Sequence, residues 1–190
     1  MYYRYSTALS HIFLSFVGVY CLRSYTAQNH NAGYHPIFSY LIVLTNSLSG
    51  IWKWGNPANG YTSNTIYSHT RLLQTIFTFP LIVTELWMKS NSCWLIAYVH
   101  IACSLLIWMC YYFRAYRDKF VDIVIALNIL SCFIVSINME NFYGMSLGLS
   151  YGINHFVLRE GCEIFEMPTI DFYNYALCFF LPFSLKALQA

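Results

Sequence analysis

Long stretches without a charged side chain constrain this sequence more than any other feature. The clearest extends from Cys93 to Phe113 without a Lys, Arg, Asp or Glu, and a second extends from Ile123 to Ile137. A helix needs about 20 mainly apolar residues to cross the hydrocarbon core of a bilayer. Because lipid offers no partner to backbone polar groups, these runs predict α-helices, and they lack the alternation typical of barrel strands.

Seven runs of this kind predict an all-α fold, a polytopic transmembrane helix bundle. The predicted helices cover residues 5–22, 36–54, 71–88, 93–113, 119–137, 141–158 and 171–188. The sixth run is rich in Gly and Ser, so six crossings plus a re-entrant sixth segment is the alternative architecture. Residues 1–190 are therefore expected to form a single integral membrane domain whose main partner is the lipid bilayer.

The composition excludes several classes of protein. Hydrophobic residues make up 58% of the chain and charged residues 9%, whereas soluble domains carry about 25% charged residues. An ordinary water-facing surface and intrinsic disorder are both excluded. The net charge is +2 and no block of Lys or Arg occurs, so nucleic acid is not an expected partner. The seven cysteines include no C-x-x-C pair, and we expect no metal and no cofactor.

The distribution of basic residues predicts an orientation. When the predicted helices are threaded through a bilayer, seven of the ten Lys and Arg residues lie on the N-terminal side. Lys and Arg collect in cytosolic loops, so the N-terminus is predicted to be cytosolic. The first helix is predicted to be a retained signal anchor, because the bulky Tyr25 stands where a cleavage site needs a small residue. Cys21 and Cys93 both fall near the outer face and could pair in an oxidising compartment.

Two acidic residues lie near predicted helix ends. Glu85 precedes Lys89 by four positions, a spacing typical of an ion pair on a helix. Asp122 lies in the first turn of the fifth predicted helix, where a carboxylate interacts well with the helix dipole. The alternative for each acid is an ion or substrate site, because ionisable groups at membrane depth are often functional.

The sixth predicted helix carries two stripes with a period of four residues. One stripe consists of Gly144, Gly148 and Gly152, and the other of Ser146, Ser150 and Asn154. At 3.6 residues per turn the two stripes lie about 200° apart. Small residues on one face allow a second helix to approach closely. We therefore expect this helix inside the bundle, with packing within the chain, a polar cavity and a contact with a second copy as three alternatives.

Histidines extend the candidate polar cavity. His155 follows Asn154 directly, and His100 lies about two turns into the fourth predicted helix. The candidate cavity residues are His100, Ser146, Ser150, Asn154 and His155. A zinc-dependent membrane hydrolase would need three converging histidines, whereas His30, His35 and His69 fall at loops or helix edges on opposite sides of the membrane.

Three functions remain open on the sequence alone. The first is a non-enzymatic, multi-pass membrane protein that acts through helix–helix contacts as a partner or assembly subunit. The second is a small transporter or channel with a polar cavity beside the sixth helix. The third, an intramembrane metal-dependent hydrolase, has the least support. The sequence does not indicate an organelle, a substrate or a named partner.

Overall fold

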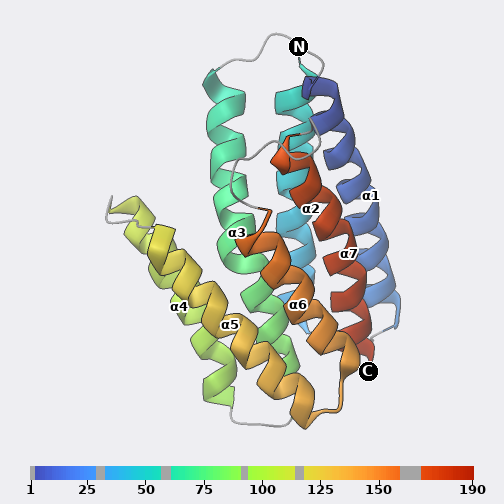
Figure 1. Cartoon of the computed structure of the whole chain (residues 1–190), viewed down its shortest axis with the longest axis vertical. Coiled ribbons are helices and arrows are strands. Elements are labelled where there is room, and N and C mark those ends of the chain that lie inside the picture. The colour runs from blue at the N-terminus through green and yellow to red at the C-terminus, as the bar shows by residue number, and fades with distance from the viewer. Residues whose placement is uncertain (1–2, 29–32, 57–60, 91–93, 114–117, 159–167) are drawn as a thin grey trace.

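A computed structural model describes residues 3–28, 33–56, 61–90, 94–113, 118–158 and 168–190. These residues form seven α-helices and no strand, which confirms the predicted all-α fold (Figure 1). The helices are α1 (Tyr3–Gln28), α2 (Tyr34–Gly55), α3 (Tyr61–Lys89), α4 (Trp94–Tyr112), α5 (Asp118–Asn138), α6 (Phe142–Phe156) and α7 (Thr169–Gln189).

Six of the seven helices close into a ring. Contacts lead from α1 through α2, α3, α5, α6 and α7 back to α1, and α4 packs outside the ring, mainly against α3. Successive helices run in opposite directions, so α1, α3, α5 and α7 begin towards the end of the bundle at which α2, α4 and α6 finish (Figure 1). The C-terminus lies at the opposite end, and α1, α2 and the start of α3 extend beyond the end of α4.

An aromatic cluster joins three helices of the ring at its centre. The ring of Tyr151 on α6 stacks on Phe79 of α3 with a centroid distance of 4.5 Å. Phe180 of α7 completes the cluster at 5.1 Å from Tyr151. The Tyr151 hydroxyl donates a hydrogen bond of 3.0 Å to the backbone carbonyl of Thr75, so its polar tip is satisfied within the core.

Several helix boundaries differ from the prediction, and α1 extends to Gln28 where the first helix was expected to end at residue 22. α3 begins at Tyr61 rather than at residue 71, and its first turns are rich in polar residues, so they form no apolar run from which a helix could be predicted. α6 has 15 residues, with Asn141 as its N-cap accepting a hydrogen bond from the Gly144 backbone N–H. At 1.5 Å per residue α6 is about 22 Å long, shorter than a hydrocarbon core of about 30 Å.

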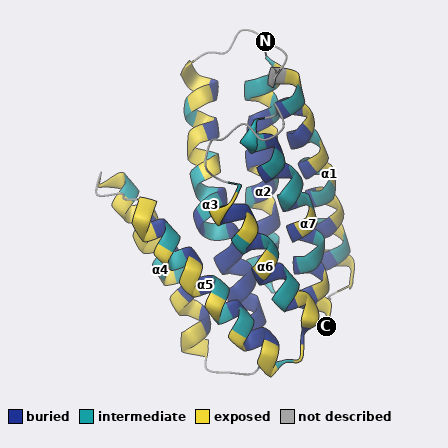
Figure 2. Ribbon diagram, viewed as in Figure 1, coloured by how far each residue is buried: buried dark blue, intermediate teal, exposed yellow. Residues whose placement is uncertain are grey.

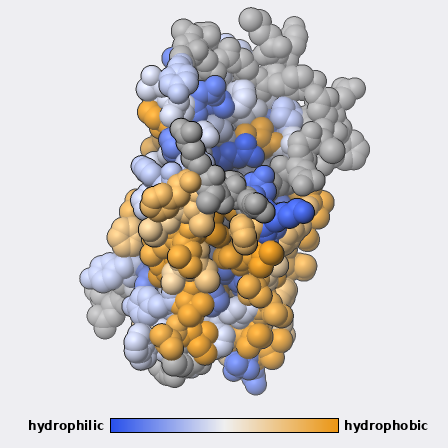
Figure 3. Space-filling model, turned by 90° about the vertical axis from the view of Figure 1, so that its left-hand side faces the viewer, coloured by the Kyte–Doolittle hydropathy of each residue, from blue (hydrophilic) through white to orange (hydrophobic). Residues whose placement is uncertain are grey.

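The described residues show an inside-out distribution of polarity. The outward faces of α4 and α5 carry large apolar side chains, including Leu106, Ile123 and Leu127 (Figure 2). Polar side chains are buried instead, among them Ser10, His11, Asn46, Gln74, Asn128, Asn154, Asp171 and Asn174. Figure 3 shows a broad hydrophobic band below a polar end of the molecule. Water-soluble proteins seldom bury so many polar groups beneath so apolar a surface.

Three helices are long and apolar enough to cross a membrane by length and composition. They are α1 from Tyr5 to Gln28, α4 from Trp94 to Tyr112, and α5 from Asp118 to Asn138. α4 and α5 also expose most of their surface. Among the other helices, α6 has only 15 residues, and α2 and α3 bury more polar side chains than α4 or α5.

Candidate functional site

The glycine stripe of α6 faces α5. A Cβ atom on Gly144 would lie 2.2 Å from the Ser136 hydroxyl oxygen, so the two backbones approach most closely there. At Gly148 the added atom would meet the Phe133 ring at 3.6 Å, and at Gly152 it would meet Ile129 at 3.4 Å, both ordinary contacts. The stripe therefore packs within the chain.

The serine stripe of α6 is only partly covered. Ser146 and Ser150 are half-buried. The Ser146 hydroxyl donates to the Phe142 carbonyl of its own helix at 3.1 Å. Asn154 is completely buried, and neither its amide nitrogen nor its amide oxygen has a hydrogen-bond partner among the described residues. The three residues of this stripe thus occupy different surroundings.

The two candidate histidines contact α5 at different heights. The His100 Nε2 atom lies 3.0 Å from the Ser131 hydroxyl, which also accepts a hydrogen bond from the indole of Trp87. The His155 Nε2 atom lies 2.9 Å from an Asp122 carboxylate oxygen. Residues 122 and 131 are about 13 Å apart along the helix axis. The structure therefore does not bring His100 and His155 into one cavity.

The expected pair between Glu85 and Lys89 does not form. Glu85 instead lies 2.9 Å from the His35 Nδ1 atom, and Lys89 donates to the backbone carbonyl of Leu188. Sequence spacing missed the Glu85 pair because its partner lies on α2, fifty positions earlier in the chain. Cys21 is a buried free cysteine, and its suggested pairing with Cys93 involves a residue outside the described ranges.

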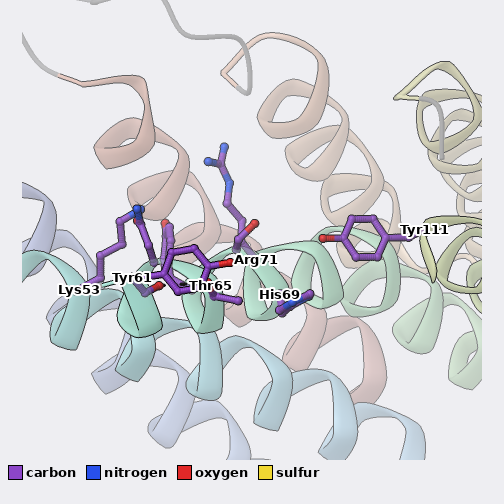
Figure 4. Close-up of a pocket in the computed structure, with 9 residues that line it drawn as sticks. Lys53, Tyr61, Thr65, His69, Arg71 and Tyr111 are labelled. Carbon is purple, nitrogen blue, oxygen red and sulfur yellow. Dashed lines mark hydrogen bonds between the residues drawn. The ribbon is translucent and has the colours of Figure 1, made fainter. Parts of the chain in front are cut away.

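A basic hollow lies where the end of α2, the first three turns of α3 and the end of α4 meet. Its volume is about 420 Å³. The side chains that define it are Lys53, Tyr61, Thr65, His69, Arg71 and Tyr111. Figure 4 shows Lys53 and Arg71 extending on the same side of α3, while Tyr111 directs its hydroxyl towards α3 from α4. We call this site the basic hollow.

Aromatic rings hold one of the two cations in place. The Lys53 ammonium lies 4.7 Å from the centroid of the Trp54 ring and 4.5 Å from that of Tyr67. Such contacts favour a cation over the face of a ring. The hydroxyl of Tyr67 in turn lies 3.3 Å from the His11 Nε2 atom, which anchors this corner of the hollow to α1.

Among the described residues, no acid forms an ion pair with a cation of the basic hollow. The Arg71 guanidinium repels Lys53, and both cations act electrostatically on His11. Neither Lys53 nor Arg71 forms an ion pair in the part of the chain that the structure describes. The buried Asp171 is engaged elsewhere, since its carboxylate accepts hydrogen bonds from Ser6 at 2.6 Å and Ser10 at 3.5 Å.

Sequence reasoning missed the basic hollow. Lys53 and Arg71 are separated in the sequence by a polar, turn-rich stretch. They belong to the seven basic residues that predict the orientation, and the sequence indicated no other role for them. Because the third helix was expected to begin at residue 71, Arg71 was expected to lie at a helix end and to face water. The extension of α3 back to Tyr61 places Arg71 well inside a helix and next to the end of α2.

Over the described residues, no cluster of three His, Cys, Asp or Glu side chains could hold a metal ion. The arrangement of the basic hollow suits binding of a negatively charged group. Comparison with protein families, with curated proteins and with solved structures finds no match to this chain.

Proposed function

We propose that this protein is a multi-pass integral membrane protein with a non-enzymatic role, acting as a partner or assembly subunit through helix–helix contacts. The observation that carries the proposal is the inside-out bundle. Exposed side chains in the middle of α5, such as Leu127, are apolar, whereas polar groups such as Asn46 and Gln74 are buried and bonded to each other at 2.7 Å. Lipid favours this distribution, because a polar group facing hydrocarbon would lose its hydrogen bonds.

The proposed orientation places the N-terminus and the basic hollow in the cytosol. Seven of the ten Lys and Arg residues fall on that side in the sequence. Association with another membrane protein is supported by α4, which stands outside the ring and exposes Trp94, Tyr98 and Trp108. We expect the purified protein to migrate with a stoichiometric partner in mild detergent. A monodisperse single chain without a partner contradicts the assembly role.

Membrane insertion can be tested with two cysteine substitutions in one helix. Lys119→Cys and Leu127→Cys both place a thiol at an exposed position of α5, one near its start and one near its middle. In membranes, a water-soluble maleimide is expected to label Lys119→Cys but not Leu127→Cys. Mass spectrometry of the digested protein locates the labelled peptides. After denaturation in dodecyl sulfate both should react. Equal labelling of both thiols in native membranes contradicts insertion of α5.

A small transporter or channel is the second candidate. It is favoured by buried polar atoms without a hydrogen-bond partner among the described residues, namely both amide atoms of Asn154 and the amide nitrogen of Gln74. Buried polar groups are usually bonded, so such atoms suit water or a polar solute. If the protein transports a solute, Asn154→Leu should reduce flux into proteoliposomes. Flux that is unaltered by this variant removes the transporter hypothesis.

A further inference from the structure

The basic hollow combines two uncompensated cations with space for an organic ligand. Lys53 and Arg71 repel each other, and neither is paired with an acid within the described ranges. The volume of about 420 Å³ falls in the range of ligand pockets, which is far more than a single ion needs. An anion bound between the two cations would relieve their repulsion.

The height of the hollow along α4 indicates which anionic group it binds. Tyr111, which lines the hollow, is next to the last residue of α4, and α4 is long and apolar enough to cross a membrane. The hollow therefore lies at the height where a membrane-spanning α4 reaches the polar headgroups. Phosphate is an anionic group that phospholipids present at this height, and Arg and Lys are the side chains that bind it best.

The hollow also offers a neutral donor and aromatic surface. The hydroxyl of Tyr61 lines it, whereas the Thr65 hydroxyl donates to the Tyr61 carbonyl at 3.0 Å. The Tyr111 ring packs edge-on against His69 at a centroid distance of 5.9 Å. A phosphomonoester carries a charge of about −1.5 to −2 at neutral pH, which suits two cations, and its attached organic group can fill the space beside the aromatic rings. We propose that the basic hollow binds a phosphomonoester through Lys53 and Arg71.

The two sources of a phosphomonoester are a lipid headgroup and a soluble compound. We would titrate the full-length protein in neutral detergent with short-chain phosphatidic acid and, separately, with glycerol 3-phosphate. Binding of phosphatidic acid alone identifies a lipid headgroup, and comparable binding of both identifies a soluble phosphomonoester. Both results support the proposal, and failure of the wild-type protein to bind either probe overturns it.

Variants test whether the two cations form the site. Arg71→Gln and Lys53→Gln are each expected to weaken binding about ten-fold or more, since each removes a charge-assisted hydrogen bond. Lys119→Gln removes a positive charge at the same end of the bundle but outside the hollow, and its affinity should match the wild type. Unchanged affinity in Arg71→Gln, or an equal loss in Lys119→Gln, overturns the proposal.

Folding of the variants can be checked separately. Because Lys53 and Arg71 repel each other, Arg71→Gln is not expected to lower the thermal midpoint of the ligand-free protein, whereas Lys53→Gln also loses the contacts with the Trp54 and Tyr67 rings. Arg71→Lys keeps the charge but loses the planar fork, and should bind with an affinity between those of the wild type and Arg71→Gln. The two cations of the hollow do not depend on the proposed function, whereas the position of the hollow at the height of the lipid headgroups rests on it. Binding of glycerol 3-phosphate would therefore survive a failure of membrane insertion.

Discussion

Gly144 marks the closest approach between α5 and α6. A Cβ atom there would lie 2.2 Å from the Ser136 hydroxyl oxygen and 3.0 Å from the Ser136 Cβ, whereas the same atom on Gly152 would make a normal contact at 3.4 Å. We expect Gly144→Ala to lower the free energy of unfolding in detergent by about 1–3 kcal/mol, the usual cost of overpacking. Gly152→Ala, on the same stripe, should have little effect. Equal thermal midpoints for the two variants would show that α6 does not pack on α5 through this stripe.

Asp171 connects the two helices that close the ring. It lies in the first turn of α7 and accepts hydrogen bonds from Ser6 and Ser10 of α1. Asp171→Ala leaves the Ser6 hydroxyl without its acceptor and removes the longer contact with Ser10, whose hydroxyl also donates to the Thr7 carbonyl at 2.9 Å. We expect a loss of about 1–3 kcal/mol. Asp118 is the matched control, because it occupies the first turn of α5 but is exposed. Because Asp118 is exposed and water screens its interactions, its replacement by Ala should cost less than about 1 kcal/mol. A chemical denaturation series in detergent would compare the two, and similar losses would contradict the role of Asp171.

The helices themselves could be predicted from the sequence, while their polar contacts could not. A helix that crosses a bilayer needs an apolar run of about 20 residues, so such runs predict helices directly. The predicted helices 93–113 and 119–137 agree with α4 and α5 almost to the residue. The first turns of α3 were expected to be a loop, because their polar residues form no apolar run. The pair between His35 and Glu85 joins residues fifty positions apart and leaves no local pattern. The basic hollow was missed for the same reason, since its cations belong to different helices.

The central aromatic cluster ties α7 to α3 and α6, and neighbouring residues of α7 allow a matched test. Phe180 is fully buried in this cluster, whereas Phe179 is 68% exposed on the outer surface. Phe180→Ala is expected to destabilise the bundle by about 3 kcal/mol. This is the lower end of the usual cost of replacing a buried Phe by Ala, because lipid also solvates apolar side chains. Phe179→Ala should be nearly neutral. Thermal unfolding in one detergent measures both, and equal midpoints would mean that the cluster does not hold the ring together.

At the scale of the whole molecule, the direction of α6 decides which side of the membrane the C-terminus occupies. α6 is shorter than a hydrocarbon core of average thickness, yet it runs from one end of the bundle towards the other (Figure 1). A short helix can cross where the bilayer thins locally, at a cost of fractions of a kcal/mol per ångström. The bundle therefore favours a crossing over the re-entrant alternative.

Lys119 and Lys186 report on this crossing because both are exposed and three helices, α5, α6 and α7, separate them. If all three cross, the two positions lie on opposite sides of the membrane. We expect an impermeant maleimide added to intact cells to label Lys186→Cys, and to label Lys119→Cys only after permeabilisation, since the N-terminal side is predicted to be cytosolic. Labelling of both thiols from the same side would mean that α6 re-enters. Labelling of Lys119→Cys alone would keep the crossing but reverse the orientation, which would place the basic hollow on the outer face.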